Sequence, residues 1–471
     1  MRGGRQPGWV RLDVVHVFVL RGDPKYPKFE LPRRSRREIV QAGPLSNRKS
    51  CSLVLMHHGA PTLWLLSLLA ATAPLAIEAG CARPMVAEPA AQAAEGAVPP
   101  EYVELFGLLE SWLQSFEELV EKRPPRGAAR PKFGVHLLVA DSNRGPLLLR
   151  SGEMVGVELT LDRFLDMGVK GISLAIGYPL LVDGFPDASR YLEFYKQVAG
   201  AVRKRGMSLA VEQIILFNRS VFSPFDLNFE GLTMADFVAA ERQMAQTIID
   251  ELSPDYFTII HEPDTFAVLT GLAEFNEPSA AIAFVTDIAG SLDRRSTLVG
   301  AGTGTWSPLA YVEGFAATTV DYIDLHLYWT YPQAIQDAYA MVDIANRHGK
   351  RIIIGEAWLY KSNGNGFEGT ASLRSWETGF RRDVFSFWAP LDIRFHTALV
   401  KFAESTGADY VSPFWTNYYF AYVDYSPETK DQGYARLVRE IAPSKVSRAI
   451  LRKERGILGD HYTRLIATNP Q

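Results

Sequence analysis

Asp255-Tyr-Phe-Thr-Ile-Ile-His-Glu-Pro263 is a largely apolar run that stops at a carboxylate, Glu262. Arg351-Ile-Ile-Ile-Gly-Glu-Ala-Trp358 repeats the pattern and stops at Glu356. Short apolar runs of this kind are typical of strands in a parallel sheet that is covered on both faces. The C-terminal ends of the strands of a (β/α)8 barrel lie on one rim, so such a barrel would bring the two glutamates together.

The surrounding sequence supports this barrel. From Lys132 onward, strand-like and helix-like stretches alternate, which predicts a parallel sheet. Eight such units predict an α/β protein with a (β/α)8 (TIM) barrel over residues 131–445. An open doubly wound sheet is the competing fold, but no glycine-rich phosphate loop follows the first strand. The expected strands are 133–139, 171–176, 207–214, 256–261, 297–302, 321–328, 351–356 and 409–415.

The helices expected between these strands show apolar residues at helical spacing. An additional N-terminal helix is expected in residues 101–125, and residues 446–471 are expected to form a C-terminal tail. Long loops are expected after the third strand and after the seventh, and both would open on the C-terminal rim, where loops shape binding clefts. The other expected helices lie near 159–167, 189–205, 233–252, 276–293, 307–317, 333–348, 391–406 and 431–441.

The N-terminal part of the chain predicts export. Leu63–Ile77 is continuously apolar, short for a membrane span, and suits the apolar region of a secretory signal in residues 56–81. Small residues then precede Cys81, which resembles a lipoprotein cleavage site, although Glu78 stands where such sites prefer an apolar residue. A plain cleavage region or an uncleaved anchor remains the alternative. We therefore expect a periplasmic, extracellular or cell-surface protein, whose only membrane contact is the signal or a lipid at Cys81.

The remaining N-terminal residues carry no expected domain. Residues 1–55 are basic and irregular, and Met56 lies just before the apolar run, so we interpret Met56 as the true start and 1–55 as an annotation artefact. Residues 82–100 are rich in Ala, Pro and Glu, as expected of a flexible tether.

The composition excludes some classes of function. The net charge of −4 gives no electrostatic reason to expect nucleic acid as a partner. The two cysteines, Cys51 and Cys81, do not form a CxxC pattern, which excludes a zinc site built from cysteines. No cofactor is expected.

The two strand-end glutamates suit the hydrolysis of a glycosidic bond. Retaining glycosidases use one carboxyl group to protonate the leaving oxygen and a second to attack the anomeric carbon. A lone glutamate at a strand end is more often an ion-pair partner. Two glutamates, one followed by Pro263 and the other by Ala-Trp358, favour a catalytic pair.

Four short motifs in strand order resemble those of a known clan. They are His261-Glu262-Pro263, His326-Leu327-Tyr328, Gly355-Glu356, and Trp415 in Ser412-Pro-Phe-Trp415. Over residues 131–445 the chain resembles the clan of (β/α)8 retaining glycoside hydrolases that includes cellulases, mannanases and galactanases. Each motif is short, and their order along the strands carries the resemblance.

The resemblance implies a role for each matching residue and an oligo- or polysaccharide with β-glycosidic bonds as substrate. Glu262 would be the acid/base and Glu356 the nucleophile, which Tyr328 would help to keep ionised by donating a hydrogen bond. His326 would bind substrate or orient a carboxylate, and Trp415 would stack on a sugar ring. The other substrate-binding candidates are His261, His136 and Trp358.

The chain departs from the clan pattern at two places. His261 stands where the clan has an asparagine that binds the sugar 2-hydroxyl. Strict strand alternation would also put His261 and Glu262 on opposite faces, so a local bulge is needed for both to point inward. Second, no arginine lies at the end of the second strand, Gly171–Tyr178, where many clan members have one that supports the nucleophile.

Two alternatives remain open. His136, Glu212, His261, His326 and Glu356 are inward candidates that could ligate a divalent metal in a barrel hydrolase or isomerase. The first strand lacks the His-x-His spacing common in metal-dependent barrel hydrolases, which counts against this function. A non-catalytic carbohydrate-binding barrel is the second alternative, and it predicts sugar binding without turnover.

Overall fold

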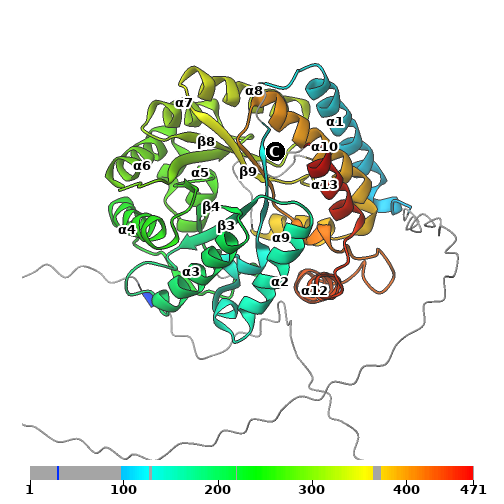
Figure 1. Ribbon diagram of the computed structural model, residues 1–471, viewed down its shortest axis with the longest axis horizontal. Coiled ribbons are helices and arrows are strands. Elements are labelled where there is room, and N and C mark those ends of the chain that lie inside the picture. Colours follow the sequence, from blue (N-terminus) through cyan, green and yellow to red (C-terminus); the bar gives the residue numbers. More distant parts are fainter. Residues whose placement is uncertain (1–28, 31–96, 127–129, 219, 364–372, 470–471) are drawn as a thin grey trace, which may run out of the picture. The chain divides into compact units, whose positions relative to one another are not determined.

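Eight parallel strands close into a barrel in the order β10-β2-β3-β4-β6-β7-β8-β9, so the predicted (β/α)8 barrel is confirmed. The computed structural model describes residues 29–30, 97–126, 130–218, 220–363 and 373–469. Helices surround the barrel (Figure 1). The barrel strands are β2 (Lys132–His136), β3 (Gly171–Tyr178), β4 (Ser208–Ile215), β6 (Tyr256–Thr258), β7 (Leu298–Gly304), β8 (Tyr322–Leu327), β9 (Arg351–Ala357) and β10 (Tyr410–Pro413).

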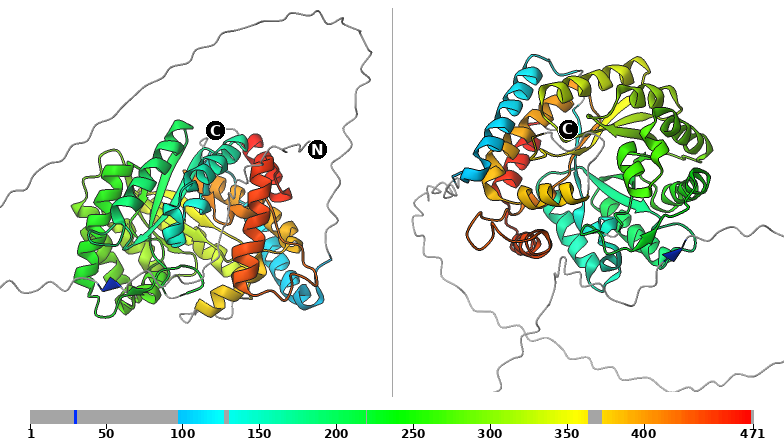
Figure 2. Two further views of the ribbon diagram at one scale, coloured as in Figure 1. Left: turned by 90° about the horizontal axis from the view of Figure 1, so that it is seen from below. Right: turned by 180° about the vertical axis from the view of Figure 1, so that it is seen from behind.

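The helices follow the predicted alternation and add several elements to it. Figure 2 shows the ring that they form from two further sides. The helices are α1 (Val103–Glu121), α2 (Glu153–Asp166), α3 (Ala188–Lys204), α4 (Met234–Leu252), α5 (Pro263–Thr270), α6 (Pro278–Ser291), α7 (Leu309–Ala317), α8 (Pro332–Arg347), α9 (Leu373–Asp383), α10 (Ala389–Thr406), α11 (Tyr434–Arg436), α12 (Ala442–Arg452) and α13 (Ile457–Thr468).

Three expected strands end two or three residues earlier than predicted. The first ends at His136, the fourth at Thr258 and the eighth at Pro413. Their last residues turn away from the ladder into 3₁₀ segments or the N-terminus of α5, although Ile259 N–H still donates to the Gly300 carbonyl at 2.9 Å. Apolar runs alone therefore overestimated these strands, because buried rim segments are as apolar as the strands they extend.

The ends of the chain also differ from simple flanks. The segment expected as a C-terminal tail completes α12 and forms α13, where Tyr462 O–H donates to the Gly134 carbonyl of β2 at 3.0 Å. Of residues 1–55, only β1 (Phe29–Glu30) is described, and it pairs in parallel with β5 (Leu227–Asn228). The expected signal, Cys81 and residues 82–96 of the tether lie outside the described residues. Within the described part of the chain, no helix combines the length and apolarity of a membrane span.

Tyrosines fill the N-terminal part of the barrel interior. Tyr256, Tyr322 and Tyr410 come from β6, β8 and β10 and pack together with Ile353. A side chain at Gly300 would clash with the Tyr322 ring, since a built Cβ lies 2.1 Å from it. Layers contributed by alternate strands are usual in such barrels. This layer packs the N-terminal part of the barrel interior, at the end opposite the C-terminal rim.

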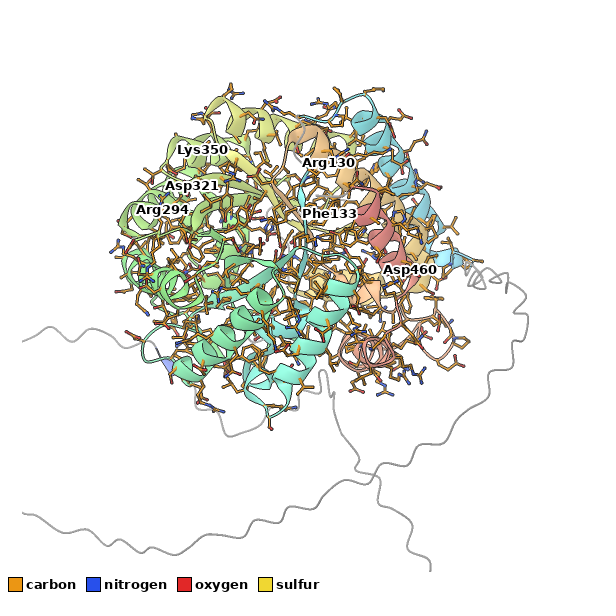
Figure 3. The ribbon with its side chains drawn as sticks, in the orientation of Figure 1. Arg130, Phe133, Arg294, Asp321, Lys350 and Asp460 are labelled. Carbon is orange, nitrogen blue, oxygen red and sulfur yellow. The ribbon has the colours of Figure 1, made fainter. Side chains whose placement is uncertain are left out.

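The opposite, N-terminal end of the barrel is held by polar contacts between neighbouring strands and helices. Arg294 Nη1 lies 3.2 Å from Asp321 Oδ2, and Lys350 Nζ donates to the Val320 carbonyl at 2.8 Å (Figure 3). Asp321 Oδ2 also accepts from the Val299 backbone N–H at 2.8 Å. Such contacts read as stability rather than catalysis, because in this fold active sites lie at the other end.

Candidate active site

A β-bulge in β9 turns Glu356 into the barrel. Asp324 of β8 pairs with Ile353, but His326, two residues on, pairs with Glu356, three residues on. Strand β10 shows the same extra residue in β9, between Ile354 and Ala357. Ile353 packs in the barrel interior, so strict alternation would have pointed Glu356 outward. The extra residue reverses this alternation, which is a known use of bulges near active sites.

Gly355 makes this bulge fit among buried carboxylates. A Cβ built on Gly355 would lie 2.4 Å from Asp324 Oδ1 and 2.7 Å from Glu212 Oε1. Its backbone N–H donates to Asp324 Oδ1 at 2.8 Å, which ties the bulge to β8. No residue with a side chain could occupy this position without moving those carboxyl groups.

Irregular backbone after β6 lets His261 and Glu262 both line the cleft. Strand β6 ends at Thr258, and Glu262 already holds the N-cap position of α5. His261 is 6% exposed and Glu262 7% exposed. The His261 Nδ1 atom lies 3.3 Å from the Gln213 carbonyl oxygen of β4. The strand thus ends early instead of forming the expected bulge, and the two side chains escape strict alternation.

His326 stands between the two glutamates. Its Nδ1 atom lies 2.9 Å from Glu262 Oε1 and 3.4 Å from Glu356 Oε2. One carboxylate oxygen of Glu262, one of Glu356 and a ring nitrogen of His326 all lie within 4.8 Å of one another. Thr265 donates its hydroxyl hydrogen to Glu262 Oε2 at 2.6 Å, and Tyr328 donates to Glu356 Oε2. The two carboxyl groups therefore face each other at the mouth of the barrel.

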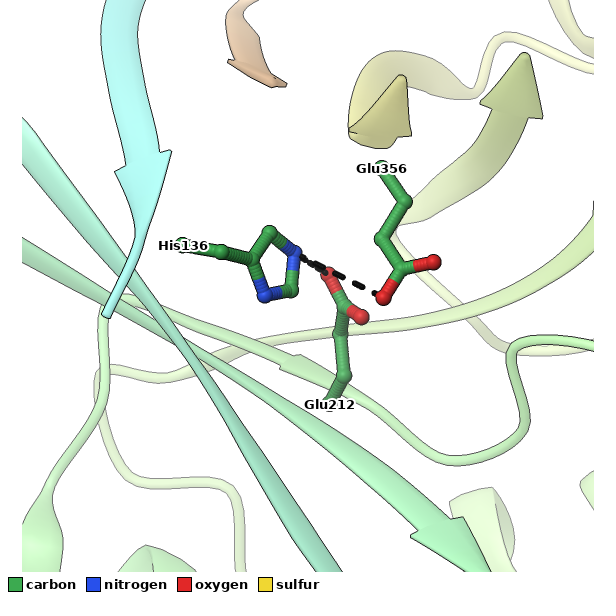
Figure 4. Close-up of side chains that lie close together, drawn as sticks. All are labelled: His136, Glu212 and Glu356. Atoms are coloured by element: carbon green, nitrogen blue, oxygen red, sulfur yellow. Dashed lines mark ion pairs between the residues drawn. The ribbon is translucent and has the colours of Figure 1, made fainter. Parts of the chain in front are cut away.

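His136 and Glu212 lie next to Glu356 in the barrel interior (Figure 4). The His136 Nε2 atom lies 3.0 Å from the Gly355 carbonyl oxygen, 3.5 Å from Glu212 Oε1 and 3.8 Å from Glu356 Oε1. Glu212 is 1% exposed, and neither of its oxygens has a hydrogen bond within the described residues. His136 thus supports Glu356 from the first strand, whereas the clan's supporting arginine was expected from the second.

Burial decides the protonation of this cluster. It raises the pKa of Glu212 to about 8, with a further contribution from the charge of Glu262. Burial also raises the pKa of Asp324 to about 7 and that of Glu356 well above its usual value. His136 and the Tyr328 hydroxyl oppose the shift at Glu356. Burial lowers the pKa of His326 to about 4, so this imidazole is neutral near pH 7.

Aromatic side chains line the cleft or pack directly behind the residues that line it. The ring of Trp306 stacks on that of Tyr328 with centroids 5.0 Å apart, and its Nε1–H donates to Asp264 at 2.9 Å. Trp358 is fixed by a 2.8 Å hydrogen bond from Nε1 to Asp383. The rings of Trp358 and Trp415 pack edge to face. Trp358 and Trp415 line the cleft together with Tyr328, and Trp306 packs on Tyr328 behind this lining.

These residues open into one cleft of about 660 Å³. His261, Glu262, Tyr328, Glu356, Trp358 and Trp415 all line it. His136 and His326 lie below it, at 2% and 0% exposure, and contact the cleft glutamates. The predicted site residues are thus brought together on the C-terminal rim, six in the cleft wall and two beneath it.

Among the residues that the structure describes, three groups of buried side chains have the spacing to hold a metal ion. They are His136 with Glu212 and Glu356, Glu212 with Asp324 and His326, and Glu262 with His326 and Glu356. The His136 Nε2 atom is already engaged with the Gly355 carbonyl, which weakens the first group as a ligand set. His261 belongs to none of these groups.

Several residues of the site escaped the sequence analysis. Asp324 lies two positions before His326 on β8, so strand alternation was a signal for it. Asp264 and Thr265 follow Glu262 in the first turn of α5, and their roles depend on where that helix begins. Trp306 left no signal, because a tryptophan in a loop is usually packing.

No protein-family profile and no curated protein matches the chain. Similar solved structures include an exo-β-1,4-mannosidase from Opitutaceae bacterium strain TAV5, at 14% identity and a TM-score of 0.44. That match covers 70% of this chain and 61% of the mannosidase, so the chain spans less than two thirds of its length.

Two other similar structures share more of their length with this chain. A GH5_18 protein from Bifidobacterium longum subsp. longum ATCC 55813 has 14% identity and a TM-score of 0.45, covering 72% of this chain and 79% of that one. A family 1 β-glucosidase from Thermotoga maritima has 11% identity and a TM-score of 0.39, covering 70% and 99%. The assignment of the fold rests on the closed order of the eight strands.

Proposed function

We propose that this protein is a retaining glycoside hydrolase that cleaves β-glycosidic bonds, with Glu262 as acid/base and Glu356 as nucleophile. One observation carries the proposal: oxygens of the two carboxyl groups lie within 4.8 Å of each other at the barrel mouth. Retaining enzymes hold this pair roughly 5–5.5 Å apart, whereas inverting enzymes need about 6.5–9.5 Å to admit a water molecule.

The first half of the reaction uses both glutamates at once. Glu356 attacks the anomeric carbon, while Glu262 gives a proton to the departing glycosidic oxygen. The Tyr328 hydroxyl donates to Glu356 Oε2, which opposes the rise that burial causes in the pKa of Glu356 and so favours the ionised carboxylate that attack requires. In the second half, Glu262 removes a proton from water, and the water releases the sugar from Glu356.

His326 supports the proton on Glu262 between these steps. Its neutral imidazole accepts a hydrogen bond at Nδ1 from a protonated Glu262, across the 2.9 Å contact. In that tautomer the Nε2–H points toward Glu212, whose Oε2 lies 3.9 Å away. When Glu262 is ionised, the other tautomer donates from Nδ1 instead. A neutral histidine thus serves both states of the acid.

The remaining predicted residues suit substrate binding. Trp358, held by its hydrogen bond to Asp383, and Trp415, packed edge to face against it, line the cleft, and sugar rings carry apolar C–H faces that stack on such surfaces. His261 lines the cleft beside Glu262, and in the sequence motif it stands where the clan has the asparagine that binds the 2-hydroxyl. We propose these three as contacts of the bound sugar.

Trapping the glycosyl-enzyme tests the proposal. A panel of activated 2-deoxy-2-fluoro β-glycosides should add one glycosyl unit to the mass of the wild-type protein, with the label on the peptide containing Glu356. Glu356→Gln should take up no label, and Glu230→Gln, on an exposed loop, should be labelled like the wild type. Label on another residue would reject Glu356 as the nucleophile. Sugar binding without any turnover would reject the hydrolase in favour of a binding barrel.

A metal-dependent hydrolase or isomerase is the second candidate. The observation that favours it is the group of Glu262, His326 and Glu356, whose ligand atoms lie within 4.8 Å of one another. Elemental analysis of purified protein separates the two candidates. A stoichiometric divalent metal, and activity lost with a chelator and restored by metal, would favour the metal enzyme.

We also propose that the protein is exported, on the evidence of the apolar run Leu63–Ile77 and the small residues before Cys81. Mass spectrometry of the mature N-terminus tests this. A chain that begins at or shortly after Cys81 is expected, with a lipid mass if Cys81 is acylated. A mature chain that retains residues 56–81 would contradict it.

A further inference from the structure

The catalytic cleft continues outward between two helices. The same cavity that Glu262 and Glu356 line is also lined by one face of α2 and one face of α12, which lie beside each other (Figure 1). We call this part the α2–α12 groove. It is formed by Val155, Gly156 and Leu159 of α2 and by Val446, Ile450 and Leu451 of α12.

The six residues of the groove are aliphatic or glycine, while Arg150, Thr160, Arg439 and Ser447 also line the cavity near them. Val155 and Leu451 are each 52% exposed, although large apolar side chains are costly to leave in water. Two charged residues of the same cavity wall, Arg144 and Glu153, form an ion pair with each other. An exposed apolar strip that runs into a cavity marks a binding surface for an apolar group.

We propose that the α2–α12 groove binds the aliphatic chain of a glycoside, so that the substrate is a sugar joined to a long hydrocarbon aglycone. This inference rests on the proposed hydrolase, because the groove gains its meaning from continuity with Glu262 and Glu356. Cavities of about 300–1,000 Å³ accommodate drug-sized ligands, and the 660 Å³ cleft exceeds what one sugar ring fills.

The lining favours a hydrocarbon over further sugar units. A sugar chain would need aromatic platforms and polar partners for its hydroxyl groups. The cleft has such groups near the two glutamates, whereas the hydroxyl groups on the cavity-lining faces of α2 and α12 are those of Thr160, which already donates to the Gly156 carbonyl, and Ser447. Each methylene buried there should strengthen binding by up to about fourfold.

Gly156 provides a way to block the groove without touching the proposed catalytic residues. A Cβ built on Gly156 meets only Val139 Cγ2, at 3.7 Å, so a larger side chain fits there and occupies the cavity. Gly200 of α3 is the matched control, because it is helical, exposed and outside the cavity, and a Cβ there meets no atom within 4 Å. Leucine at either position also favours the helix.

Calorimetric titration with 1-hexanol, 1-octanol and 1-decanol tests the groove without any turnover. In the wild type and in Gly200→Leu, Kd should fall by up to about fourfold per methylene. In Gly156→Leu, the Kd for 1-decanol should rise about tenfold, the equivalent of roughly two buried methylenes. Leu451→Ser, at an exposed site, should weaken binding in the same direction. Equal Kd values for the three alcohols, or for the wild type and both groove variants, would overturn the proposal.

Turnover then separates this proposal from the hydrolase itself. With decyl and methyl β-glycosides of one sugar, kcat/KM should favour the decyl substrate, and Gly156→Leu should remove most of that preference. Equal kcat/KM for the two substrates would overturn the aglycone proposal while leaving the hydrolase intact. Alcohol binding with no cleavage of any β-glycoside would overturn the hydrolase alone.

Discussion

The Nδ1 atom of His326 lies 2.9 Å from the Oε1 atom of Glu262, so the end of β8 directly contacts the start of α5. The contact involves a histidine that burial keeps neutral at pH 7, because its pKa is lowered to about 4. Depending on its tautomer, the Nδ1 atom of a neutral imidazole can either accept a hydrogen bond or donate one. This is the property that an acid/base carboxyl group needs in its neighbour.

Substitution of Glu262 should reveal its role through the leaving group. Glu262→Gln should retain the most activity on substrates whose leaving groups need little protonation, and should lose about 10²–10⁴-fold on natural glycosides. The measurement is kcat/KM for a series of aryl and alkyl β-glycosides. Equal losses on both kinds of substrate would count against Glu262 as the acid.

Substitution of Glu212 should shift the pH dependence of activity. Burial and the charge of Glu212 both act to raise the pKa of Glu356, so an ionised Glu212 makes Glu356 harder to ionise. Because the pKa of Glu212 is about 8, this charge is present only near and above pH 8. In Glu212→Gln it is absent, so the part of the acidic limb of the kcat/KM profile that lies near or above pH 8 should move to lower pH. Glu212→Asp keeps a titrating group and should move the limb less. An unchanged limb in Glu212→Gln would separate Glu212 from the ionisation of Glu356.

Substitution of His261 should distinguish a sugar contact from packing. If His261 contacts the 2-hydroxyl, His261→Ala should lower kcat and kcat/KM together, the signature of an interaction made in the transition state. His261→Asn restores the clan's own donor and should retain more activity than alanine. A lower Tm with unchanged kinetics in both variants would instead assign the ring to packing against Phe266, with which it makes an edge-on contact.

A methyl group at Gly355 should disturb both stability and activity. In Gly355→Ala the new Cβ would lie 2.4 Å from Asp324 Oδ1, so the bulge must shift. We expect a loss of about 1–3 kcal/mol in the free energy of unfolding, and about 10²-fold in kcat if Glu356 moves by 1 Å. Gly107→Ala on α1 is the control, since nothing lies within 4 Å of its Cβ. Equal activity in both variants would mean that the bulge is not needed.

A buried glutamate outside the cleft should make stability fall as pH rises. Glu241 of α4 is 0% exposed, its oxygens have no hydrogen bond within the described residues, and burial raises its pKa well above 4.5. Above pH 4.5 the folded protein keeps this proton while the unfolded chain releases it, so the unfolded state binds fewer protons. The free energy of unfolding therefore decreases by up to about 1.4 kcal/mol per pH unit until the folded pKa is reached.

Glu241→Gln removes that titration. Its unfolding free energy should depend less on pH between 5 and 8, and the variant should gain on the wild type as pH rises. Denaturant melts at a series of pH values measure this. Parallel curves for the two proteins would show that Glu241 does not hold a proton in the folded state. Glu230→Gln, on an exposed loop, is the matched control.

Local patterns of the sequence were enough for the fold. Eight apolar runs that alternate with helical stretches specify eight strands, since an apolar run must be buried between layers. The confirmed strand order shows that the pattern carries this information without any long-range detail. The strand ends were less predictable, as at Thr258, because rim segments are buried like strands and keep single hydrogen bonds, as from Ile259 to Gly300, but leave the regular ladder.

The sequence by itself determined which side chains lie at the C-terminal rim of the barrel, among them Glu262, His326 and Glu356. Only the tertiary structure decided how they face one another. Closure of the barrel brings residues from distant strands within hydrogen-bond range, and one extra residue at Gly355 reverses the face of Glu356. Protonation was likewise decided by the fold, because the pKa of a carboxyl group such as Glu212 depends on burial and on charges that only folding assembles.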